Sequence, residues 1–379
     1  MYFDHSATSY PKPDCVKQAV YESLDLYGNA GRGSYPLSLR AGRLLYQTRE
    51  LCKEFFHAPV NSSVVFTSGA TESLNIVIQG LFHRGDHIVT TRMEHNAVLR
   101  PLYEMERRGI SLSYLNVNEL GIIDPHLEEE LIQKQPKAVI CTHASNVTGN
   151  ITDLKTLSRI CHQHAILLII DAAQTAGHYP IDMEEDGIDI LCFSGHKGLL
   201  GPAGCGGIIM RKDYGIHPLL YGGSGFDSYS HKQPENLPER LEAGTLPISA
   251  IAGMQAGIRY IQQIGIEEIY RKEYHLASLF YEGIKDLSGI QFAGDMEAKD
   301  RCAIVSFTLE SLDSAELTDI LINEYDIAVR GGAHCAPLVH RHFHTEESGL
   351  TRFSFGYDQS EEEVLRAITA VRDITQVSL

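Results

Sequence analysis

The chain of 379 residues is 43% hydrophobic and 21% charged, which is typical of a globular protein with one large domain and a smaller one. Its 32 Lys and Arg stand against 49 Asp and Glu, and the resulting net charge of −17 would repel a phosphate backbone, which excludes a nucleic acid as a direct partner. The first residues form neither a basic nor an apolar leader, and the longest apolar run, residues 165–170, is too short to cross a membrane.

The eight cysteines are scattered along the chain without a Cys-x-x-Cys pair, and most lie in apolar stretches. Such cysteines are typical of reduced core residues rather than of a disulfide framework. We therefore expect a cytoplasmic protein without membrane contact. Cys335 differs from the others because it lies in a polar, glycine-rich run.

An extended start leads into two helices, after which strands and helices alternate. Helices are predicted over residues 14–26, from residue 36 onward, and over residues 70–82, 96–107, 152–164, 247–285, 315–323 and 361–373. Strands are predicted over residues 63–67, 87–91, 137–142, 166–170, 188–193 and 206–210, with shorter ones near residue 306, over 327–329 and from residue 352.

Several of these strands are continuous apolar runs, which a sheet covered by helices on both faces requires. We predict an α/β fold whose large domain, residues 14–255, is doubly wound around a mainly parallel sheet. The long helix marks the boundary to a smaller α+β domain, residues 256–379, on which residues 1–13 are expected to pack.

In an open α/β sheet, ligands gather where the strands end, so the residues after each strand are informative. Residues 67–73 form a glycine turn that opens into a helix, where free N–H groups suit a phosphate, although an ordinary helix cap fits equally well. His95 follows the next strand, either to stack on an aromatic cofactor or as a loop histidine. Asn146 follows a third strand, as an amide facing the cleft or as part of a capping loop.

The most informative strand, residues 166–170, ends at Asp171. A carboxylate that follows five aliphatic residues is costly to bury unless a cation meets it. Lys197 follows the next strand, among small and turn-forming residues. An Asp that faces a protonated pyridine nitrogen, together with a Lys Schiff base, is typical of pyridoxal phosphate enzymes.

These motifs give the chain a resemblance to a known family. It resembles the class V, fold-type I pyridoxal phosphate enzymes, and among them the cysteine desulfurases, most closely the group II (Suf-type) ones. The resemblance extends from Tyr2 to Arg352, which is essentially end to end. It rests on the joint spacing of five motifs, residues 69–72, 94–96, 145–147, 171–174 and 194–197.

The resemblance implies a role for each matching residue. Lys197 would hold pyridoxal 5'-phosphate covalently, and Asp171 would bind its pyridine nitrogen. His95 would stack on the pyridine ring and also take part in catalysis. Gln174 and Asn146 would lie near its phenolic oxygen. The phosphate would be held by several segments, through Ala70, Thr71, Ser194, His196 and, from a second subunit, Thr245. A homodimer is therefore implied.

Residues 330–337 form a glycine-rich turn in which Cys335 stands beside a histidine and near Arg330. A thiolate is favoured in such a place, and the thiolate is the nucleophile. The run matches the group II pattern Arg-x-Gly-x-His-Cys, which implies that Cys335 accepts sulfur and that Arg330 lies at the substrate. Ala333 stands where that pattern usually has a second histidine, a departure that could lower the rate or alter the sulfur acceptor.

Arg352 is implied to clamp the substrate carboxylate together with Asn146, whereas a surface ion pair is the alternative role of Arg352. Its short separation from Cys335 limits the reach of the thiol, so an acceptor must come to it. Between the two, His340, His342 and His344 alternate. Because no cysteine or carboxylate of matching spacing lies nearby, we interpret them as a loop or part of an acceptor-docking surface rather than as a metal site.

The resemblance implies conversion of L-cysteine to L-alanine, with the sulfur passed as a persulfide on Cys335 to an acceptor protein. The nearest alternatives are a selenocysteine lyase, acting on L-selenocysteine, and a cysteine desulfhydrase. An aminotransferase or epimerase would need no thiol, and a non-catalytic sulfur-relay or scaffold protein could keep the same fold. The pathway fed, whether iron–sulfur assembly, tRNA thiolation or selenium use, stays open.

Overall fold

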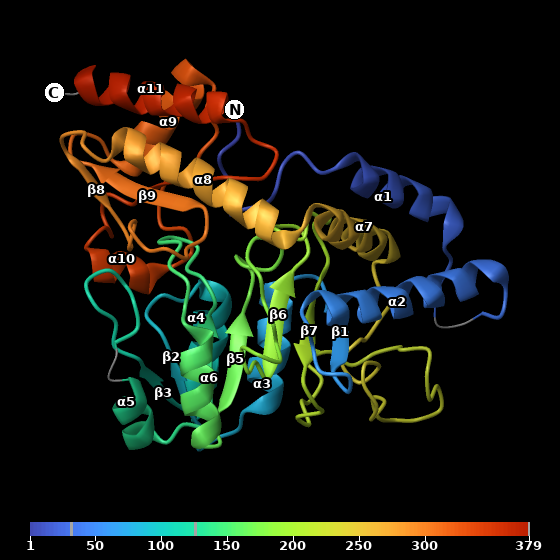
Figure 1. Cartoon of the computed structure of the whole chain (residues 1–379). Helices are drawn as coiled ribbons and strands as arrows, with labels where there is room; N and C mark the ends of the chain where they lie inside the picture. The colour runs from blue at the N-terminus through green and yellow to red at the C-terminus, as the bar shows by residue number, and fades with distance from the viewer. Residues whose placement is uncertain (31–32, 125–126, 378–379) are drawn as a thin grey trace.

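The computed structural model describes residues 1–30, 33–124 and 127–377. The centre of its larger part is a seven-stranded sheet (Figure 1). Its strands are β1 (Ser63–Thr67), β2 (His87–Thr90), β3 (Ser111–Tyr114), β4 (Ala138–Thr142), β5 (Leu167–Asp171), β6 (Ile190–Ser194) and β7 (Gly206–Met210). They lie in the order β1-β7-β6-β5-β4-β2-β3, and β7 runs antiparallel to both of its neighbours while β2 to β6 pair in parallel. This mainly parallel sheet confirms the predicted fold class.

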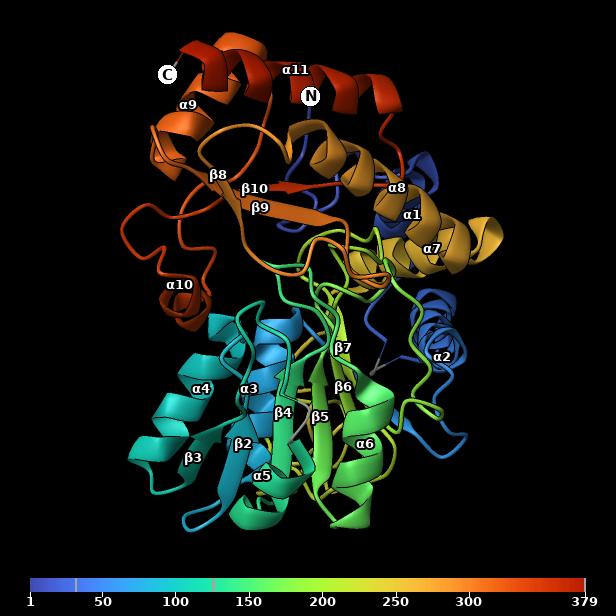
Figure 2. The same cartoon turned by 60° about the vertical axis from the view of Figure 1, so that its left-hand side comes forward.

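Helices cover both faces of this sheet, as the apolar strands require. In β5, Leu168 and Ile170 pack into one hydrophobic cluster and Ile169 into another, because successive side chains of a strand point to opposite faces. The first cluster includes residues of α6 and the second includes residues of α3, and Figure 2 shows the helices layered around the sheet. The helices of this part are α1 (Asp14–Leu26), α2 (Pro36–Phe55), α3 (Ala70–Leu81), α4 (Asn96–Arg107), α5 (Leu127–Lys134), α6 (Leu154–Gln163) and α7 (Ile248–Ile264).

A smaller antiparallel sheet, in the order β10-β9-β8, forms the second part of the molecule. Its elements are α8 (Ile266–Ile284), β8 (Ile290–Phe292), β9 (Ile304–Leu309), α9 (Ser314–Tyr325), α10 (Pro337–Phe343), β10 (Thr351–Ser354) and α11 (Glu361–Val377). The N-terminal segment joins this part, because Tyr2 bridges to Ala328 and Asp4 bridges to Ser354. The N-terminus therefore lies beside α11 in Figure 1.

The predicted long helix over residues 247–285 is in fact two helices, α7 and α8. They are separated by Gly265, whose φ of 94° is in the left-handed region that ends a helix. The boundary expected at residues 255 and 256 falls inside α7, where Ile258 and Ile261 still pack against the large sheet. Among the residues that the structure describes, no helix has the length and apolar character needed to span a membrane.

Two further expectations need correction. The segment 327–329 is not a strand. Only Ala328 of this segment pairs with the N-terminal segment, at Tyr2, and one bridged pair is too short to form a strand. The stretch expected to be a loop with alternating histidines contains the short helix α10, which begins at Pro337, a residue suited to the first turn. His340 and His342 lie on this helix and His344 caps it. The short elements β3 and α5 were not predicted, since neither has a long periodic pattern.

The core of the small domain is aromatic, and its stability should depend on Phe280 of α8. This ring is fully buried and stacks on Phe353 with centroids 4.4 Å apart. We expect Phe280→Ala to lower the free energy of unfolding by about 3–5 kcal/mol, measured by urea denaturation. The control Leu365→Ala, on an exposed position of α11, should change it by less than about 1 kcal/mol, and equal effects would contradict this packing.

Candidate active site

A cavity of about 230 Å³ lies where β4, β5 and β6 end and the small domain begins. Parallel strands end at one edge of the sheet, so residues far apart in sequence meet there. Eleven of the predicted site residues line it, namely Ala70, Thr71, His95, Asn146, Asp171, Gln174, Ser194, His196, Lys197, Arg330 and Arg352. Cys335 and Thr245 are not part of this lining.

Asp171 and Lys197 bring opposite charges to the cavity. The Asp171 side chain is buried at the end of β5, and its Oδ1 accepts a hydrogen bond from the Ala173 N–H at 2.9 Å. Burial raises the pKa of Asp171, while that N–H and the charge of Lys197 oppose the rise. Burial lowers the pKa of Lys197 to about 8, which Asp171 partly offsets and Arg352 reinforces. The two groups therefore favour each other's charged form in a site that disfavours either one alone.

The N-terminal segment fixes the turn that carries Lys197. The hydroxyl of Thr8 donates to the His196 carbonyl at 2.9 Å, and that of Ser9 donates to the Lys197 carbonyl at 2.8 Å. Lys12 Nζ lies 2.7 Å from the same His196 carbonyl. Three side chains from the start of the chain thus hold the lysine-bearing turn against the end of the sheet.

The start of α3 faces the cavity and offers a place for an anion. Gly69 precedes the helix with φ of 150°, and Gly206 of the adjacent β7 lies so close to Gly69 that an added Cβ would come within 2.6 Å of its Cα. The Ala70 N–H donates to Ser194 Oγ at 3.0 Å. The helix N-terminus, Thr71 and the Ser194 hydroxyl are together suited to a phosphate.

His95 caps α4 and lines the cavity as a neutral imidazole. Its Nδ1 accepts from the Ala97 N–H at 3.0 Å, which leaves the hydrogen on Nε2. Burial, reinforced by the charge of Lys197, lowers its pKa to about 4. The preceding Glu94 is fully buried, with Oε1 accepting from Thr91 Oγ1 at 2.6 Å and from the Thr142 N–H at 3.1 Å. Glu94 thereby ties the histidine turn to the end of β4.

Arg352 lies on β10 and is nearly inaccessible to solvent. Its Nη2 donates to Asp4 Oδ1 at 2.7 Å and its Nη1 donates to the Asn146 carbonyl at 2.9 Å. Its Nε is buried without a hydrogen-bond partner among the described residues. The Asp4 carboxylate holds the guanidinium in place, and the Nε–H is among the donors that remain for a ligand.

Cys335 is exposed and lies on a turn tied to the large domain. His334 and Cys335 have φ of 48° and 56°, an unfavourable conformation for two successive residues with side chains. The Cys335 carbonyl accepts from the Asn96 N–H at 2.7 Å, and the His334 carbonyl accepts from Asn146 Nδ2 at 2.9 Å. These bonds hold the thiol-bearing turn beside the cavity in spite of its strained backbone.

Thr245 belongs to the lining of a different cavity, of about 490 Å³, together with residues of α2 such as Tyr46 and Arg49. Within one chain it therefore does not join the other predicted phosphate ligands. This placement is compatible with the expectation that Thr245 acts from a second subunit.

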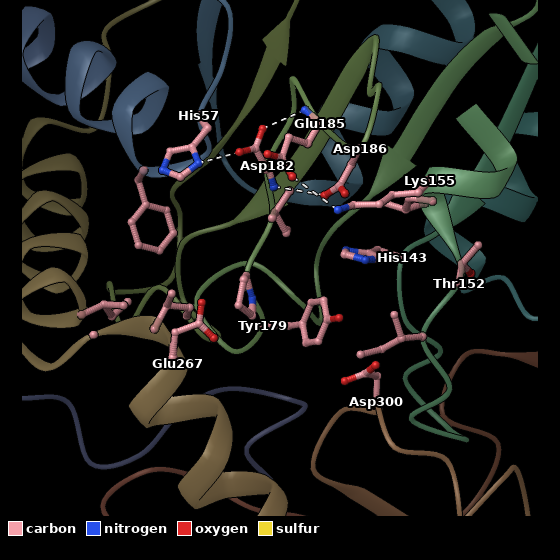
Figure 3. Close-up of a pocket in the computed structure, with 18 of the residues that line it drawn as sticks. His57, His143, Thr152, Lys155, Tyr179, Asp182, Glu185, Asp186, Glu267 and Asp300 are labelled. Atoms are coloured by element: carbon pink, nitrogen blue, oxygen red, sulfur yellow. Dashed lines mark hydrogen bonds and ion pairs between the residues drawn. The ribbon is translucent and has the colours of Figure 1, made fainter. Parts of the chain in front are cut away.

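The largest of these cavities, of about 1140 Å³, lies between α2, α6 and the junction of α7 and α8 (Figure 3). Its charged groups are mostly carboxylates, Glu54, Asp153, Asp182, Glu185, Asp186, Glu267 and Asp300. Lys155 in its lining already pairs with Glu185 at 3.3 Å. None of the predicted site residues faces it, and its negative charge opposes a phosphate or carboxylate ligand. Size alone therefore does not identify the active site of this molecule.

The family model for class V aminotransferases matches residues 1–366 of the chain. The chain belongs to the class V aminotransferase family. A probable cysteine desulfurase of Methanothermobacter thermautotrophicus is 34% identical over 371 residues, which cover 96% of this chain and 92% of the relative. A cysteine desulfurase of Haloferax volcanii is 33% identical over 382 residues, which cover 98% of this chain and 88% of the relative.

A solved structure with the same fold is the apo structure of the cysteine desulfurase from Thermococcus onnurineus NA1. It matches this class V family member with a TM-score of 0.91 at 34% identity, over 99% of this chain and 94% of that chain. The likeness therefore extends over the large sheet and the small domain alike.

The class V family implies pyridoxal phosphate, and the residues of the cavity fit this group. Asp171 offers a buried carboxylate to a pyridine nitrogen, Lys197 offers an amine to an aldehyde, and the start of α3 offers N–H groups to a phosphate. The buried Asn146 Oδ1 has no partner among the described residues, which leaves it free to meet a polar group of a ligand.

Sequence reasoning missed three residues of this site. Asp4 holds Arg352, but no local signal marks it, because the contact spans almost the whole chain. Glu94 stands directly before His95 in a recognised motif, yet its burial could not be read from that motif. His334, in the run that precedes Cys335, lines the cavity beside Arg330 and Arg352.

Glu94 should make stability depend on pH. Burial, with a smaller contribution from Asp171, raises its pKa from 4.5 to about 8. The folded state therefore binds this proton more tightly than the unfolded state, and the stability that results is complete below pH 4.5 and is lost as the pH rises through about 8. Glu94→Gln should reduce the loss of unfolding free energy between about pH 6 and about pH 9 by about 2 kcal/mol, measured by urea denaturation.

The control for this prediction is Glu310→Gln, at an exposed position, which should keep the pH dependence of the parent protein. The same pH dependence in Glu94→Gln and in the parent would show that Glu94 is not a buried acid.

Proposed function

We propose that this protein is a pyridoxal phosphate-dependent cysteine desulfurase that converts L-cysteine to L-alanine and passes the sulfur, as a persulfide on Cys335, to an acceptor protein. The observation that carries the proposal is the meeting of Asp171, Lys197 and Arg352 in one cavity, with the exposed Cys335 on the adjoining turn. The relatives named cysteine desulfurases support it over nearly the whole chain.

The proposed roles in cofactor binding follow the cavity lining. Lys197 holds the cofactor, Asp171 meets the pyridine nitrogen, and His95 stacks on the ring with Gln174 and Asn146 at its edge. Ala70, Thr71, Ser194 and His196 hold the phosphate, with Thr245 of a second subunit. When bound, pyridoxal phosphate supplies an electron sink for the bond that breaks at the substrate.

Substrate binding in this proposal depends on charge. Arg352 meets the carboxylate of L-cysteine through its unpaired Nε, and Arg330, exposed at the mouth of the cavity, adds a second positive charge. The amine of Lys197, with its pKa lowered to about 8, can take the proton from the substrate Cα near neutral pH. Asp4 and the Asn146 carbonyl keep Arg352 in position meanwhile.

The sulfur step belongs to Cys335. Its thiolate attacks the substrate sulfur, a new S–S bond forms, and the electron pair of the broken C–S bond stays on carbon. Carbon then takes up protons and leaves as alanine, so that L-cysteine and one thiol give L-alanine and one persulfide. Because Cys335 is held on a tied turn outside the cavity lining, the acceptor would collect the sulfur from the exposed side.

The proposed assembly is a cytoplasmic homodimer in which residues 14–255 form the large domain and residues 256–379, with 1–13, the small one, while the end of α7 beyond residue 255 packs on the large sheet. Large apolar side chains are exposed on α1, α2 and the loop before α7, and these segments lie on one side of the molecule in Figure 1. They are Tyr21, Leu24, Tyr35, Leu39, Tyr46, Tyr221, Phe226 and Tyr229. Thr245 lines a cavity that α2 also lines, so it would belong to the same dimer interface.

Cys335→Ser should abolish the persulfide and reduce alanine formation from L-cysteine to background, while the cofactor absorption stays unchanged. The serine hydroxyl does not replace the thiolate as a nucleophile toward sulfur. Mass spectrometry of the protein and an alanine assay measure the two effects. Cys15→Ser, which alters the other exposed cysteine of the described residues, should behave as the parent does. Undiminished alanine formation by Cys335→Ser would overturn the role of Cys335.

Lys197→Ala should remove the borohydride-reducible link between protein and cofactor. Among the described residues that line the cavity, Lys197 is the only lysine. Peptide mapping after borohydride treatment checks this, with the exposed Lys299→Ala as a control that keeps the link. A cofactor still reduced onto the Lys197→Ala protein would place the attachment at another residue.

A further inference from the structure

Three buried side-chain atoms of the cavity residues have no hydrogen-bond partner among the described residues. Arg352 Nε is a donor that suits a carboxylate, and Asn146 Oδ1 is an acceptor that suits a polar group of the cofactor or substrate. The third atom is Nδ1 of His334, which the proposed mechanism does not use. Buried polar atoms without partners are rare in native proteins and indicate a missing ligand or water.

The hydrogen-bond role of His334 follows from its other ring nitrogen. Nε2 lies 2.9 Å from the carbonyl oxygen of Leu350, which can only accept, so Nε2 carries the ring hydrogen. The side chain is only 4% exposed, and burial, reinforced by Arg352, lowers its pKa to about 3. The ring is therefore neutral near pH 7, and Nδ1 is left as an acceptor without hydrogen.

The position of this acceptor is fixed by the backbone. The His334 carbonyl is bonded to Asn146 Nδ2, and the next carbonyl, of Cys335, is bonded to the Asn96 N–H. His334 thus lines the cavity one residue before the thiol that the proposed mechanism directs at the substrate sulfur. If Arg352 holds the carboxylate of the substrate, the substrate side chain lies between Arg352 and Cys335.

We infer that His334 is a substrate-binding residue whose Nδ1 accepts a hydrogen bond from the side-chain S–H of the bound amino acid. The inference rests on the proposed function. The carboxylate of the substrate is matched by Arg352 and its amino group belongs to the Lys197 end of the cavity, so the side-chain thiol is the donor left for Nδ1. No proton is transferred in this contact.

The contact gives the site a higher affinity for the substrate, L-cysteine, than for the product, L-alanine. L-Cysteine offers Nδ1 a donor, whereas the methyl group of L-alanine offers none and leaves a buried acceptor unpaired. His334 therefore favours the substrate over the product, in addition to any general contribution to binding that both ligands share.

The test compares two ligands in two proteins. In the Cys335→Ser holoprotein, where sulfur transfer is blocked, the dissociation constants of L-cysteine and L-alanine are measured from the change in cofactor absorption. The same constants are then measured after adding His334→Phe. We expect the preference for L-cysteine over L-alanine to fall about fivefold, with the affinity for L-alanine changed less than about twofold.

Two further variants keep the test decisive. His340→Phe replaces the ring that stacks on His334 with centroids 6.0 Å apart but does not line the cavity, so it should leave the preference unchanged. If His334→Phe does not fold, His334→Asn serves instead, because asparagine tolerates positive φ and its shorter side chain withdraws the acceptor.

The outcomes distinguish a failure of the proposed His334 contact from a failure of the proposed desulfurase function. A preference that stays the same in the His334 variant, or equal weakening of both ligands, overturns the substrate contact alone. A parent protein that forms no alanine from L-cysteine overturns the proposed function and the contact with it.

Discussion

The site depends on the burial of a carboxylate at the end of a central strand. Asp171 follows aliphatic residues on β5, has almost no contact with solvent and receives one backbone N–H, so its charge needs a cation nearby. Lys197 follows the adjacent strand β6 and supplies one. The parallel pairing of these two strands is what brings the groups together, and the N-terminal segment holds the lysine-bearing turn in place. Both side chains line the cavity for which pyridoxal phosphate is proposed.

Asn146 links the two halves of the molecule around this site. Its carbonyl accepts from Arg352 of the small domain, its Nδ2 donates to the carbonyl of His334, and its Oδ1 is left for a ligand. Arg352, which is proposed to bind the amino acid, and the turn that carries Cys335 therefore meet at one residue of the large domain. A change in the position of Asn146 would displace both Arg352 and Cys335.

The sequence was sufficient to predict six of the seven strands of the large sheet, because continuous apolar strands specify burial on both faces, and to predict Asp171 and Lys197 at strand ends. The fold class and the family are confirmed, whereas the individual site roles stay predictions, most of them implied by the resemblance. What could not be predicted depends on contacts between distant segments. Asp4 meets Arg352 only because the N-terminus packs on the small domain, and His334 became informative only through the orientation that the Leu350 carbonyl imposes. Local patterns carry no information on such pairings.

The central claim is that this fold moves sulfur from a free amino acid onto its own cysteine. The most direct measurement is a single turnover of the purified holoprotein with L-cysteine in the absence of reductant, in which alanine, free sulfide and persulfide are quantified. The account predicts one alanine for each persulfide, with the persulfide on Cys335 and little free sulfide. Sulfide released in step with alanine, without a persulfide on Cys335, would contradict it and indicate a desulfhydrase instead.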